Sequence, residues 1–370
     1  MNLIKKIAAV LLAVMMVMSF AACHPKNEVA VTVDGVEFTS AYYMCALIFA
    51  DSEARSKVDE KLAEEKKDDE ETTTSTEAVD YYKQKIDKKK FVDWVEDRAI
   101  ETLKQIAAYK IKCKDADVKL EDDVKTSAEQ YASYYWSSYG YAALLEPNGV
   151  SQATYTDYMV DSYYSSAYFE HVYGEGGEKE IAADEVNKSL LENFLVANML
   201  DVDTSSMEEA DKTSTKAKLD GYVTSLTNGS KTFEDIYHDY YGTDPKEAHP
   251  ETEEETEEGE APLDSHASIL GTEDTAYASD HFETAKAMAT GEIKLIEKED
   301  KNGYVLLVKQ DISADPYYAK NLDLSVRNLI KGDEFEKDMN GYAKDLKTDI
   351  NDYAVKQFKV KKIEYPETTY

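Results

Sequence analysis

The chain has 370 residues, of which 75 are Asp or Glu and 42 are Lys or Arg, so its formal net charge is −33. Nucleic-acid binding rests on Lys and Arg contacts to phosphate, and this charge balance excludes it. The same balance excludes electrostatic adhesion to anionic lipid, so membrane attachment needs a different anchor.

Residues 1–22 are typical of a secretory signal peptide. Two lysines precede an apolar core that is too short for a stable membrane span. Phe20-Ala21-Ala22-Cys23 resembles a bacterial lipobox, in which the cysteine is lipidated and becomes the first mature residue. We therefore expect Cys23 to anchor the protein at the extracytoplasmic face of a bacterial cell membrane. The alternative is an ordinary signal peptide followed by an incidental cysteine.

Residues 23–185 are expected to form a mostly helical part. It opens with a strand at Val29–Val33, a tight turn at Asp34-Gly35 and a short return strand. Thr39 or Ser40 is then expected to cap a helix.

Two further segments of this part have clear patterns. Residues 64–77 carry no large apolar side chain, which predicts a disordered acidic loop. From Phe91 to Lys112, apolar residues recur at steps of three and four, which predicts a core helix.

The region from residue 128 to residue 173 contains eleven tyrosines and Trp136. Tyrosine combines a large apolar area with a polar tip and loses little side-chain entropy, which suits the binding of varied chains. Adjacent tyrosines on a helix point in different directions, so part of this cluster must be core. A substantial exposed patch would be a binding site, and the sequence leaves its existence open.

Cysteine and histidine positions indicate no metal site. Cys45 and Cys113 lie in apolar helical stretches, which favours two buried free thiols, with a disulfide as the alternative. The histidines lack the paired spacing of a zinc-binding helix, and no EF-hand spacing is present. We expect neither a metal nor another cofactor.

Residues 186–310 predict a small α+β domain. A buried strand at Phe194–Val202 is followed by a helix that stops at Asn228-Gly229, and Thr232 is expected to cap a second helix. A third helix begins at Phe282, and a hairpin closes the domain. An acidic insert at residues 243–264 interrupts it and is expected to be disordered.

Residues 311–370 predict more helix. One helix is expected through Leu322 and Ile330, and a second from Glu334 to Leu346. The alternating residues Phe358 to Ile363 predict a closing strand.

In their order, the motifs of residues 186–310 resemble the parvulin domain of peptidyl-prolyl isomerases. Asn198-Met199-Leu200 stands where the family has His-Ile-Leu, and Gly303-Tyr304-Val305 stands where it has Gly-Tyr-His. Leu270-Gly271 and Phe282 match its Leu-Gly and the helix after it. Tyr241-Gly242-Thr243-Asp244 matches its Tyr-Ser-x-Asp.

The resemblance implies a prolyl pocket in which Asn198, Asp244 and Val305 gather in one hollow. Asp244 is the remaining catalytic candidate, and Leu270 and Phe282 are expected to line the peptide-binding pocket. Both family histidines are absent. Asn198 can hydrogen-bond but cannot titrate near neutral pH, and Val305 can do neither. We expect a catalytically impaired domain, and an active isomerase is the alternative.

The flanking segments extend the resemblance. The opening strand, Asp-Gly turn, strand and helix are similar to the N-terminal segment of the PrsA and SurA foldases, which are extracytoplasmic chaperones with parvulin domains. In these foldases the C-terminal segment packs on the N-terminal helices, so the parvulin unit is an insertion. The resemblance therefore implies an α+β protein in which residues 23–185 and 311–370 form a helical chaperone-like domain.

The implied function is a lipid-anchored foldase or holdase for unfolded, newly secreted polypeptides. Its partners would be those polypeptides and the membrane, without nucleic acid. The sequence leaves open whether the protein forms a homodimer. A solute-binding lipoprotein is the second alternative, although that class builds two lobes from repeated strand–helix–strand units.

Overall fold

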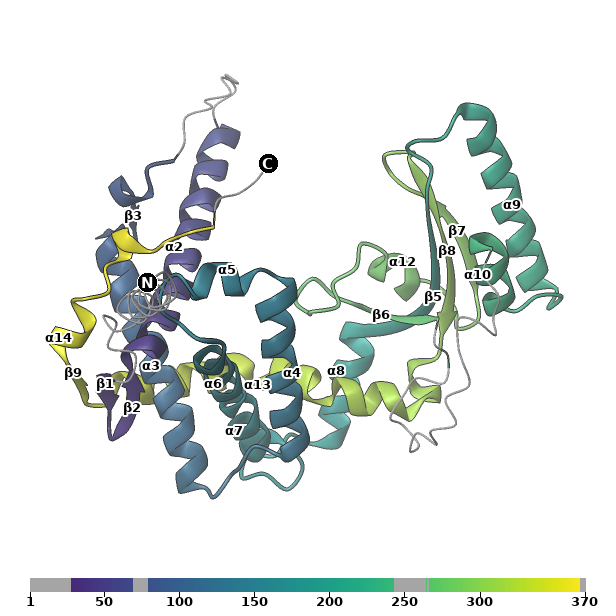
Figure 1. The fold of residues 1–370 in the computed structure, drawn as a ribbon. Coiled ribbons are helices and arrows are strands. Elements are labelled where there is room, and N and C mark those ends of the chain that lie inside the picture. The colour runs from purple at the N-terminus through teal and green to yellow at the C-terminus, as the bar shows by residue number, and fades with distance from the viewer. Residues whose placement is uncertain (1–27, 69–78, 243–263, 265, 367–370) are drawn as a thin grey trace, which may run out of the picture. The chain divides into compact units, whose positions relative to one another are not determined.

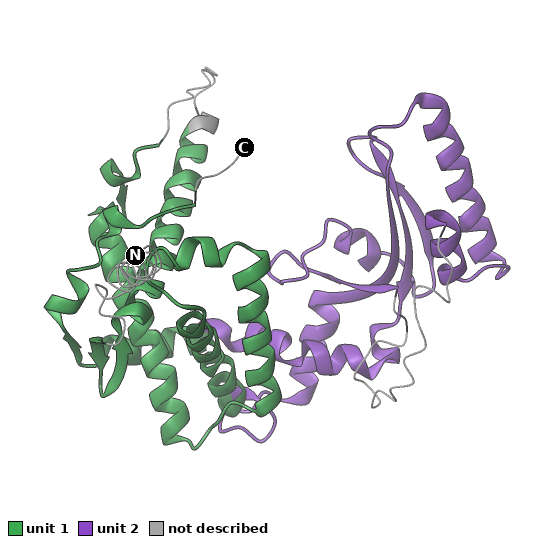
Figure 2. Ribbon diagram, viewed as in Figure 1, with its two compact units in different colours: residues 1–172, 334–370 green, residues 173–333 purple. Residues whose placement is uncertain are grey.

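The computed structural model describes residues 28–68, 79–242, 264 and 266–366 (Figure 1). The predicted signal peptide, Cys23 and Asp244 lie outside the described residues. Contacts divide the chain into unit 1, residues 1–172 and 334–370, and unit 2, residues 173–333 (Figure 2). The predicted parvulin-like domain, 186–310, falls inside unit 2. None of the helices in the described ranges is both long and apolar enough to span a bilayer.

Unit 1 contains an antiparallel sheet with strand order β2-β1-β9. The hairpin between β1 (Val29–Val33) and β2 (Val36–Thr39) turns at Asp34 and Gly35, whose φ angles of 42° and 86° are left-handed. Asp-Gly is the sequence that such a turn favours, so this prediction is confirmed. β9 (Thr348–Ile350) pairs with the other edge of β1, and the C-terminal segment thereby completes an N-terminal sheet.

The predicted strand at Phe358–Ile363 is wrong. The segment instead contains a 3-10 turn at Val360–Lys362. Its alternating pattern has another cause: Val360 and Ile363, three residues apart, are both buried. A short apolar alternation does not distinguish a strand from a turn that buries every third side chain.

The most extensive contact between helices of unit 1 joins α2 (Ser40–Asp68) and α3 (Phe91–Asp115). α2 packs on α3 and α6, and α6 packs on α4. These elements are α2 (Ser40–Asp68), α3 (Phe91–Asp115), α4 (Asp122–Ser138), α5 (Tyr141–Leu145), α6 (Gln152–Ser162), α7 (Tyr164–Tyr173) and α14 (Asp352–Val355), with the small hairpin β3 (Lys85–Ile86) and β4 (Lys89–Lys90). The helix predicted from Phe91 is confirmed as α3. α2 continues through Asp68, so residues 64–68 of the predicted loop are helical, and residues 69–77 lie outside the described part.

Unit 2 contains an antiparallel sheet with strand order β6-β5-β8-β7. Figure 1 shows α9 and α10 on one side of this sheet and α12 on the other. The elements are α8 (Ala183–Asn193), β5 (Phe194–Asp203), α9 (Glu209–Thr227), α10 (Phe233–Tyr241), β6 (Ala267–Gly271), α12 (Phe282–Lys286), β7 (Ile293–Glu297) and β8 (Gly303–Gln310). Thr232 caps α10 in a reciprocal capping box with Asp235, as its position predicted.

A single helix, α13 (Pro316–Asp345), replaces the two helices predicted after residue 315. Gly332 lies inside it with a helical backbone. Glycine costs a helix about 1 kcal/mol relative to alanine but does not end it unless the backbone turns left-handed. Gly242 shows the contrast, because its φ of 66° ends α10.

The prediction of a mostly helical α+β chain is confirmed. The strand pairs within the three described sheets are antiparallel. A solute-binding protein of two lobes with parallel strands is therefore not the architecture of the described residues.

Candidate functional site

The sheet of unit 2 brings three of the predicted pocket residues together. Val305 on β8, Leu270 on β6 and Phe282 on α12 are all buried in one apolar cluster, with Ala197, Ala285, Met288 and Leu307. This cluster fills the space between the sheet and α12. The residues expected to line a peptide pocket therefore contact one another as a small core.

Two motif glycines lie where other parts of unit 2 approach the backbone closely. A Cβ at Gly271 would collide with Thr275 Oγ1, and one at Gly303 would collide with the carbonyl oxygen of Val202. Gly271 also accepts a hydrogen bond from the Ser279 amide at 3.2 Å, which brings the chain back to the start of α12. Close backbone approach explains why glycine occupies both positions.

Asn198 lies on the opposite face of the sheet from Val305. Asn198 is paired with Val308, whereas Val305 is paired with Asp201, three residues further along β5. Side chains alternate between the two faces of a strand, so positions 198 and 201 point in opposite directions. The expectation that Asn198, Asp244 and Val305 share one hollow is therefore wrong for Asn198 and Val305. A shift of one residue along a strand moves a side chain to the other face.

The Asn198 side chain has a structural role instead. Its Nδ2 donates to Asp264 Oδ2 at 2.7 Å, and its Oδ1 accepts from Gln310 Nε2. Asn198 is completely buried, so these bonds satisfy both ends of its amide. Asp264 also acts on Tyr318. The burial of Tyr318, together with the charges of Asp315 and Asp264, raises the pKa of its hydroxyl to about 12.

The tyrosines of residues 128–173 range from buried to exposed. Tyr155 is fully buried, and its ring lies 5.4 Å from that of Tyr141 and 6.0 Å from Trp136. Tyr131, Tyr134 and Tyr139 are 53%, 53% and 63% exposed. The prediction that part of the cluster is core is borne out. The remaining tyrosines of residues 128–173 are half-buried, namely Tyr135, Tyr141, Tyr158, Tyr163, Tyr164 and Tyr168, apart from Tyr173, which is buried.

Tyr134, Tyr135 and Tyr139 are in ring contact at the end of α4, and Tyr131 lies on the same face of the helix. Tyr131, Tyr134 and Tyr135 are three and four positions apart and so share a helix face. The Tyr139 ring lies 5.5 Å from the Tyr134 ring and 5.1 Å from the Tyr135 ring. Tyr135 contacts Tyr141 at 5.9 Å, which joins the patch to the buried set. We call residues Tyr131, Tyr134, Tyr135 and Tyr139 the α4 tyrosine patch.

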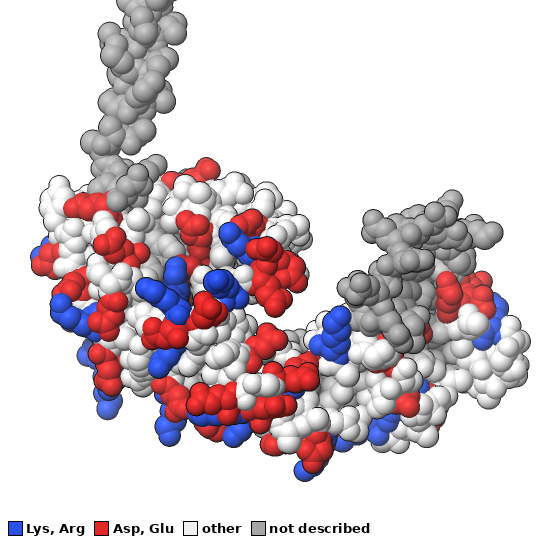
Figure 3. All heavy atoms as spheres, turned by 90° about the horizontal axis from the view of Figure 1, so that it is seen from below, with Lys and Arg blue, Asp and Glu red and all other residues white. Residues whose placement is uncertain are grey.

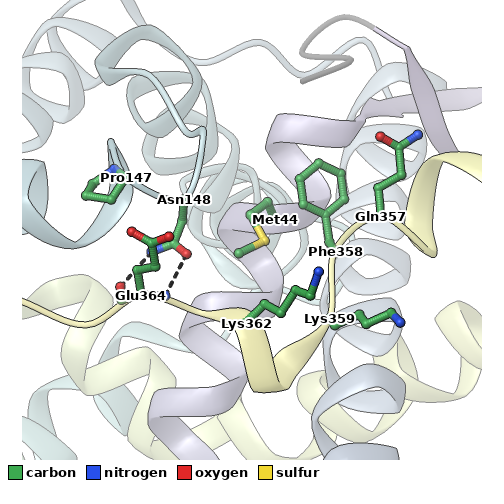
Figure 4. Close-up of a pocket in the computed structure, with 8 residues that line it drawn as sticks. All are labelled: Met44, Pro147, Asn148, Gln357, Phe358, Lys359, Lys362 and Glu364. Atoms are coloured by element: carbon green, nitrogen blue, oxygen red, sulfur yellow. Dashed lines mark hydrogen bonds between the residues drawn. The ribbon is translucent and has the colours of Figure 1, made fainter. Parts of the chain in front are cut away.

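Unit 1 also contains a cavity of about 270 Å³ (Figure 4). Its lining combines apolar Met44, Pro147 and Phe358 with charged Lys359, Lys362 and Glu364, together with Asn148 and Gln357. Figure 4 shows Phe358 beside Met44, and Asn148 joined to Glu364 by hydrogen bonds. Sequence reasoning missed this site because Pro147-Asn148-Gly149 has the composition of an ordinary turn, which hides the role of Asn148.

A second feature that sequence reasoning missed surrounds Arg55 in α2. Its guanidinium carbon lies 4.5 Å from the centre of the Tyr81 ring and 4.6 Å from that of Tyr365. Its Nε donates to Asp51 Oδ2 at 2.6 Å. The Tyr365 hydroxyl donates to the same oxygen. The pKa of Tyr365 is raised, mainly by its burial and also by this hydrogen bond to Asp51. No sequence signal connects residues 51 and 365.

The two internal cysteines are not joined by a disulfide. Cys45 and Cys113 are both buried free thiols, which confirms that reading over the disulfide. In the described residues, no group of three or more His, Cys, Asp or Glu side chains has the geometry of a metal site. Asp244 and Cys23 lie outside the described part.

Comparison with known proteins gives structural neighbours but no match in sequence. No family model and no curated protein matches the chain. The foldase PrsA of Streptococcus pneumoniae is similar at 14% identity and a TM-score of 0.38, covering 66% of this chain and 82% of that one. PrsA of Lactococcus lactis is similar at 13% identity and a TM-score of 0.36, covering 89% of this chain and 97% of that one.

The chain is similar to PrsA foldases. PrsA of Bacillus subtilis is a further neighbour, at 14% identity and a TM-score of 0.28, covering 71% of this chain and 81% of that one. Identities of 13–14% do not assign an activity to this chain.

Proposed function

We propose that this protein is an extracytoplasmic, lipid-anchored holdase or foldase that binds unfolded secreted polypeptides through unit 1. The α4 tyrosine patch carries this proposal. Tyr131, Tyr134 and Tyr139 are more than half exposed, and Tyr134 and Tyr139 are in ring contact with each other. Such side chains offer an amphipathic surface at low entropic cost. A patch of this kind needs no cofactor and no energy source to bind an unfolded chain.

The charge of the chain supports the same proposal. Figure 3 shows Asp and Glu side chains over much of the face drawn, with Lys and Arg side chains between them. A net charge of −33 keeps the protein soluble, and it would also keep a complex with an aggregation-prone client dispersed. Because acidic residues are repelled by anionic lipid, we propose that the lipid on Cys23 supplies the attachment.

We propose further that unit 2 has little or no prolyl isomerase activity. An isomerase must lower a barrier of about 18–20 kcal/mol by binding a twisted amide in a shaped pocket. Val305 lies in a filled apolar cluster, and Asn198 points to the other face with both amide ends hydrogen-bonded. Neither can assist a twisting proline. A proline-peptide assay should show rates within about twofold of the spontaneous reaction, which takes tens of seconds.

An aggregation assay tests the binding function. An unfolding secretory protein is followed by light scattering with and without the full chain. The variant Tyr131→Ser/Tyr134→Ser/Tyr139→Ser should lose most of the suppression. The matched control is Tyr353→Ser, because Tyr353 is 72% exposed but lies on α14, outside the patch. Equal suppression by the triple variant and the wild type would remove the patch from the proposal.

A further inference from the structure

Residues 363–366, at the C-terminal end of unit 1, lie against its N-terminal part and are held there through their main chain. Asn148 Nδ2 donates to the Glu364 carbonyl oxygen at 2.8 Å, and the Glu364 amide donates to Asn148 Oδ1 at 2.9 Å. A primary amide that pairs with both main-chain groups of one residue recognises a backbone and not a side chain. Asn148 is buried and also donates to the Leu144 carbonyl oxygen at 2.7 Å, which fixes its orientation.

The next residue, Tyr365, is held through its side chain. Its ring stacks on the Arg55 guanidinium, and its hydroxyl reaches the carboxylate of Asp51. Asp51 is completely buried, so the tip of the phenol is enclosed although Tyr365 as a whole is 39% exposed. The combination of a cation under the ring and an acceptor at its tip selects an aromatic side chain with a donor group.

The site is not saturated by these residues. Asp51 Oδ1 is buried and accepts no hydrogen bond in the described structure, although its partner oxygen accepts from both Arg55 and Tyr365. The cavity of about 270 Å³ begins beside Glu364 and Asn148 and extends toward Met44 and Phe358. A bound chain with a larger apolar side chain near this position would bury surface that residues 363–366 leave open.

We propose that residues 363–366 occupy a polypeptide-binding groove of unit 1 as an internal stand-in for a client, and that unfolded segments containing tyrosine displace them. The proposal rests on the proposed function and names how a client is gripped. Asn148 hydrogen-bonds to the client main chain, and the Asp51–Arg55 pair binds a tyrosine side chain. The cavity binds a neighbouring apolar side chain. The internal segment lowers the apparent affinity, because only the fraction of molecules with an open groove can bind.

A peptide-binding measurement on the full chain tests this groove. The probe is a fluorescent peptide, Lys-Ile-Glu-Tyr-Pro-Glu, which repeats the internal segment and is followed by anisotropy. The variant Tyr365→Ala should bind it about tenfold more tightly than the wild type, since the competing phenol contact is removed. Tyr353→Ala, an exposed tyrosine outside the groove, should bind like the wild type. The same peptide with alanine in place of its tyrosine should bind Tyr365→Ala about tenfold more weakly.

A second variant protects the test against a folding defect. Tyr365→Phe keeps the ring on Arg55 and loses only the hydroxyl, so its affinity should fall between those of the wild type and Tyr365→Ala. Thermal unfolding of each variant verifies the fold. If folded Tyr365→Ala, or Tyr365→Phe where the alanine variant does not fold, binds the peptide no more tightly than the wild type, the proposal is overturned.

The aggregation assay separates this inference from the proposed function. Suppression of client aggregation by the wild type, without any gain in peptide binding by the Tyr365 variants, would remove the groove and leave the holdase intact. Absence of suppression by the wild type would remove the holdase itself.

Discussion

The motif residues of unit 2 and the tyrosines at the end of α4 in unit 1 differ in burial. In unit 2, both faces of the sheet are covered, one by α12 and the other by α9 and α10, and the motif residues Leu270, Phe282 and Val305 form core. In unit 1, tyrosines continue from the core out to the surface of α4. The residues matched to an isomerase pocket are therefore core in unit 2, whereas the α4 tyrosine patch of unit 1 is on the surface.

The largest expected effect is the difference in stability between core and surface aromatics. Phe194→Ala in unit 2 should lower the free energy of unfolding by about 3–5 kcal/mol, because Phe194 is fully buried in the cluster with Tyr318 and Leu322. Tyr134→Ala in the patch should change it by less than about 0.5 kcal/mol. Urea unfolding monitored by circular dichroism measures both. A large cost for Tyr134→Ala would mean that the patch is part of the core.

The second expected effect concerns Asn198. Asn198→Ala should cost about 1–3 kcal/mol, since it leaves Gln310 and Asp264 without their buried partner. Asn198→His, which restores the family's residue type, should leave proline isomerisation at the spontaneous rate. Urea unfolding and a proline-peptide assay check the two statements. An increase in isomerisation with Asn198→His would show that position 198 faces a working pocket.

The third expected effect is a loss of stability at alkaline pH. Burial raises the pKa of Tyr42 above its ordinary value of 10.0, and the neighbouring Asp161 adds to the shift. The stabilisation is complete below pH 10, where both states are protonated, and is lost as pH rises toward the folded pKa. Above pH 10, the unfolding free energy should fall by about 1.4 kcal/mol per pH unit for this group.

Tyr42→Phe tests that slope. The variant has no phenol to ionise, so its unfolding free energy should decline less steeply between pH 10 and pH 12 than that of the wild type, as measured by urea midpoints. Identical slopes would contradict a buried Tyr42 and so weaken the division of the tyrosines of unit 1 into core and surface sets.

The smallest expected effect is the unreactivity of the two thiols of unit 1. Burial raises the pKa of Cys113 to about 11, and it also raises the pKa of Cys45. The thiolate is the reactive form, so neither residue should react with a disulfide reagent at pH 8 until the protein is unfolded. A disulfide reagent that releases a coloured thiolate measures this reaction. Colour from the native protein at pH 8 would show that this core opens.

Local patterns in the sequence predicted many of the elements but not the tertiary contacts between them. Asp34-Gly35 and Thr232 were readable because a turn and a helix cap depend on neighbouring residues alone. β9 was missed because Thr348–Ile350 is a strand only through its pairing with β1. Residues 358–363 show the converse, because their apolar alternation has no partner strand among the described residues and the segment forms a 3-10 turn instead.

The candidate site shows the same limit more strongly. The motifs found Leu270, Phe282 and Val305 as a group, because all three belong to one face of one small domain. They placed Asn198 on the wrong face, since motif matching does not set strand register to a single residue. Asn148 meets Glu364 across 216 positions, Asp51 meets Tyr365 across 314, and no local signal predicts either contact.

Photo-crosslinking to an unfolded client tests most directly whether unit 1 grips the client. A photoreactive phenylalanine is placed at Tyr134 on α4 and, separately, at Tyr241 on α10 of unit 2. The two positions are matched, because the tyrosines are 53% and 50% exposed and each contacts neighbouring tyrosine rings. We expect crosslinks to the client from position 134 and few from position 241. Crosslinks mainly from position 241 would contradict the assignment of binding to unit 1.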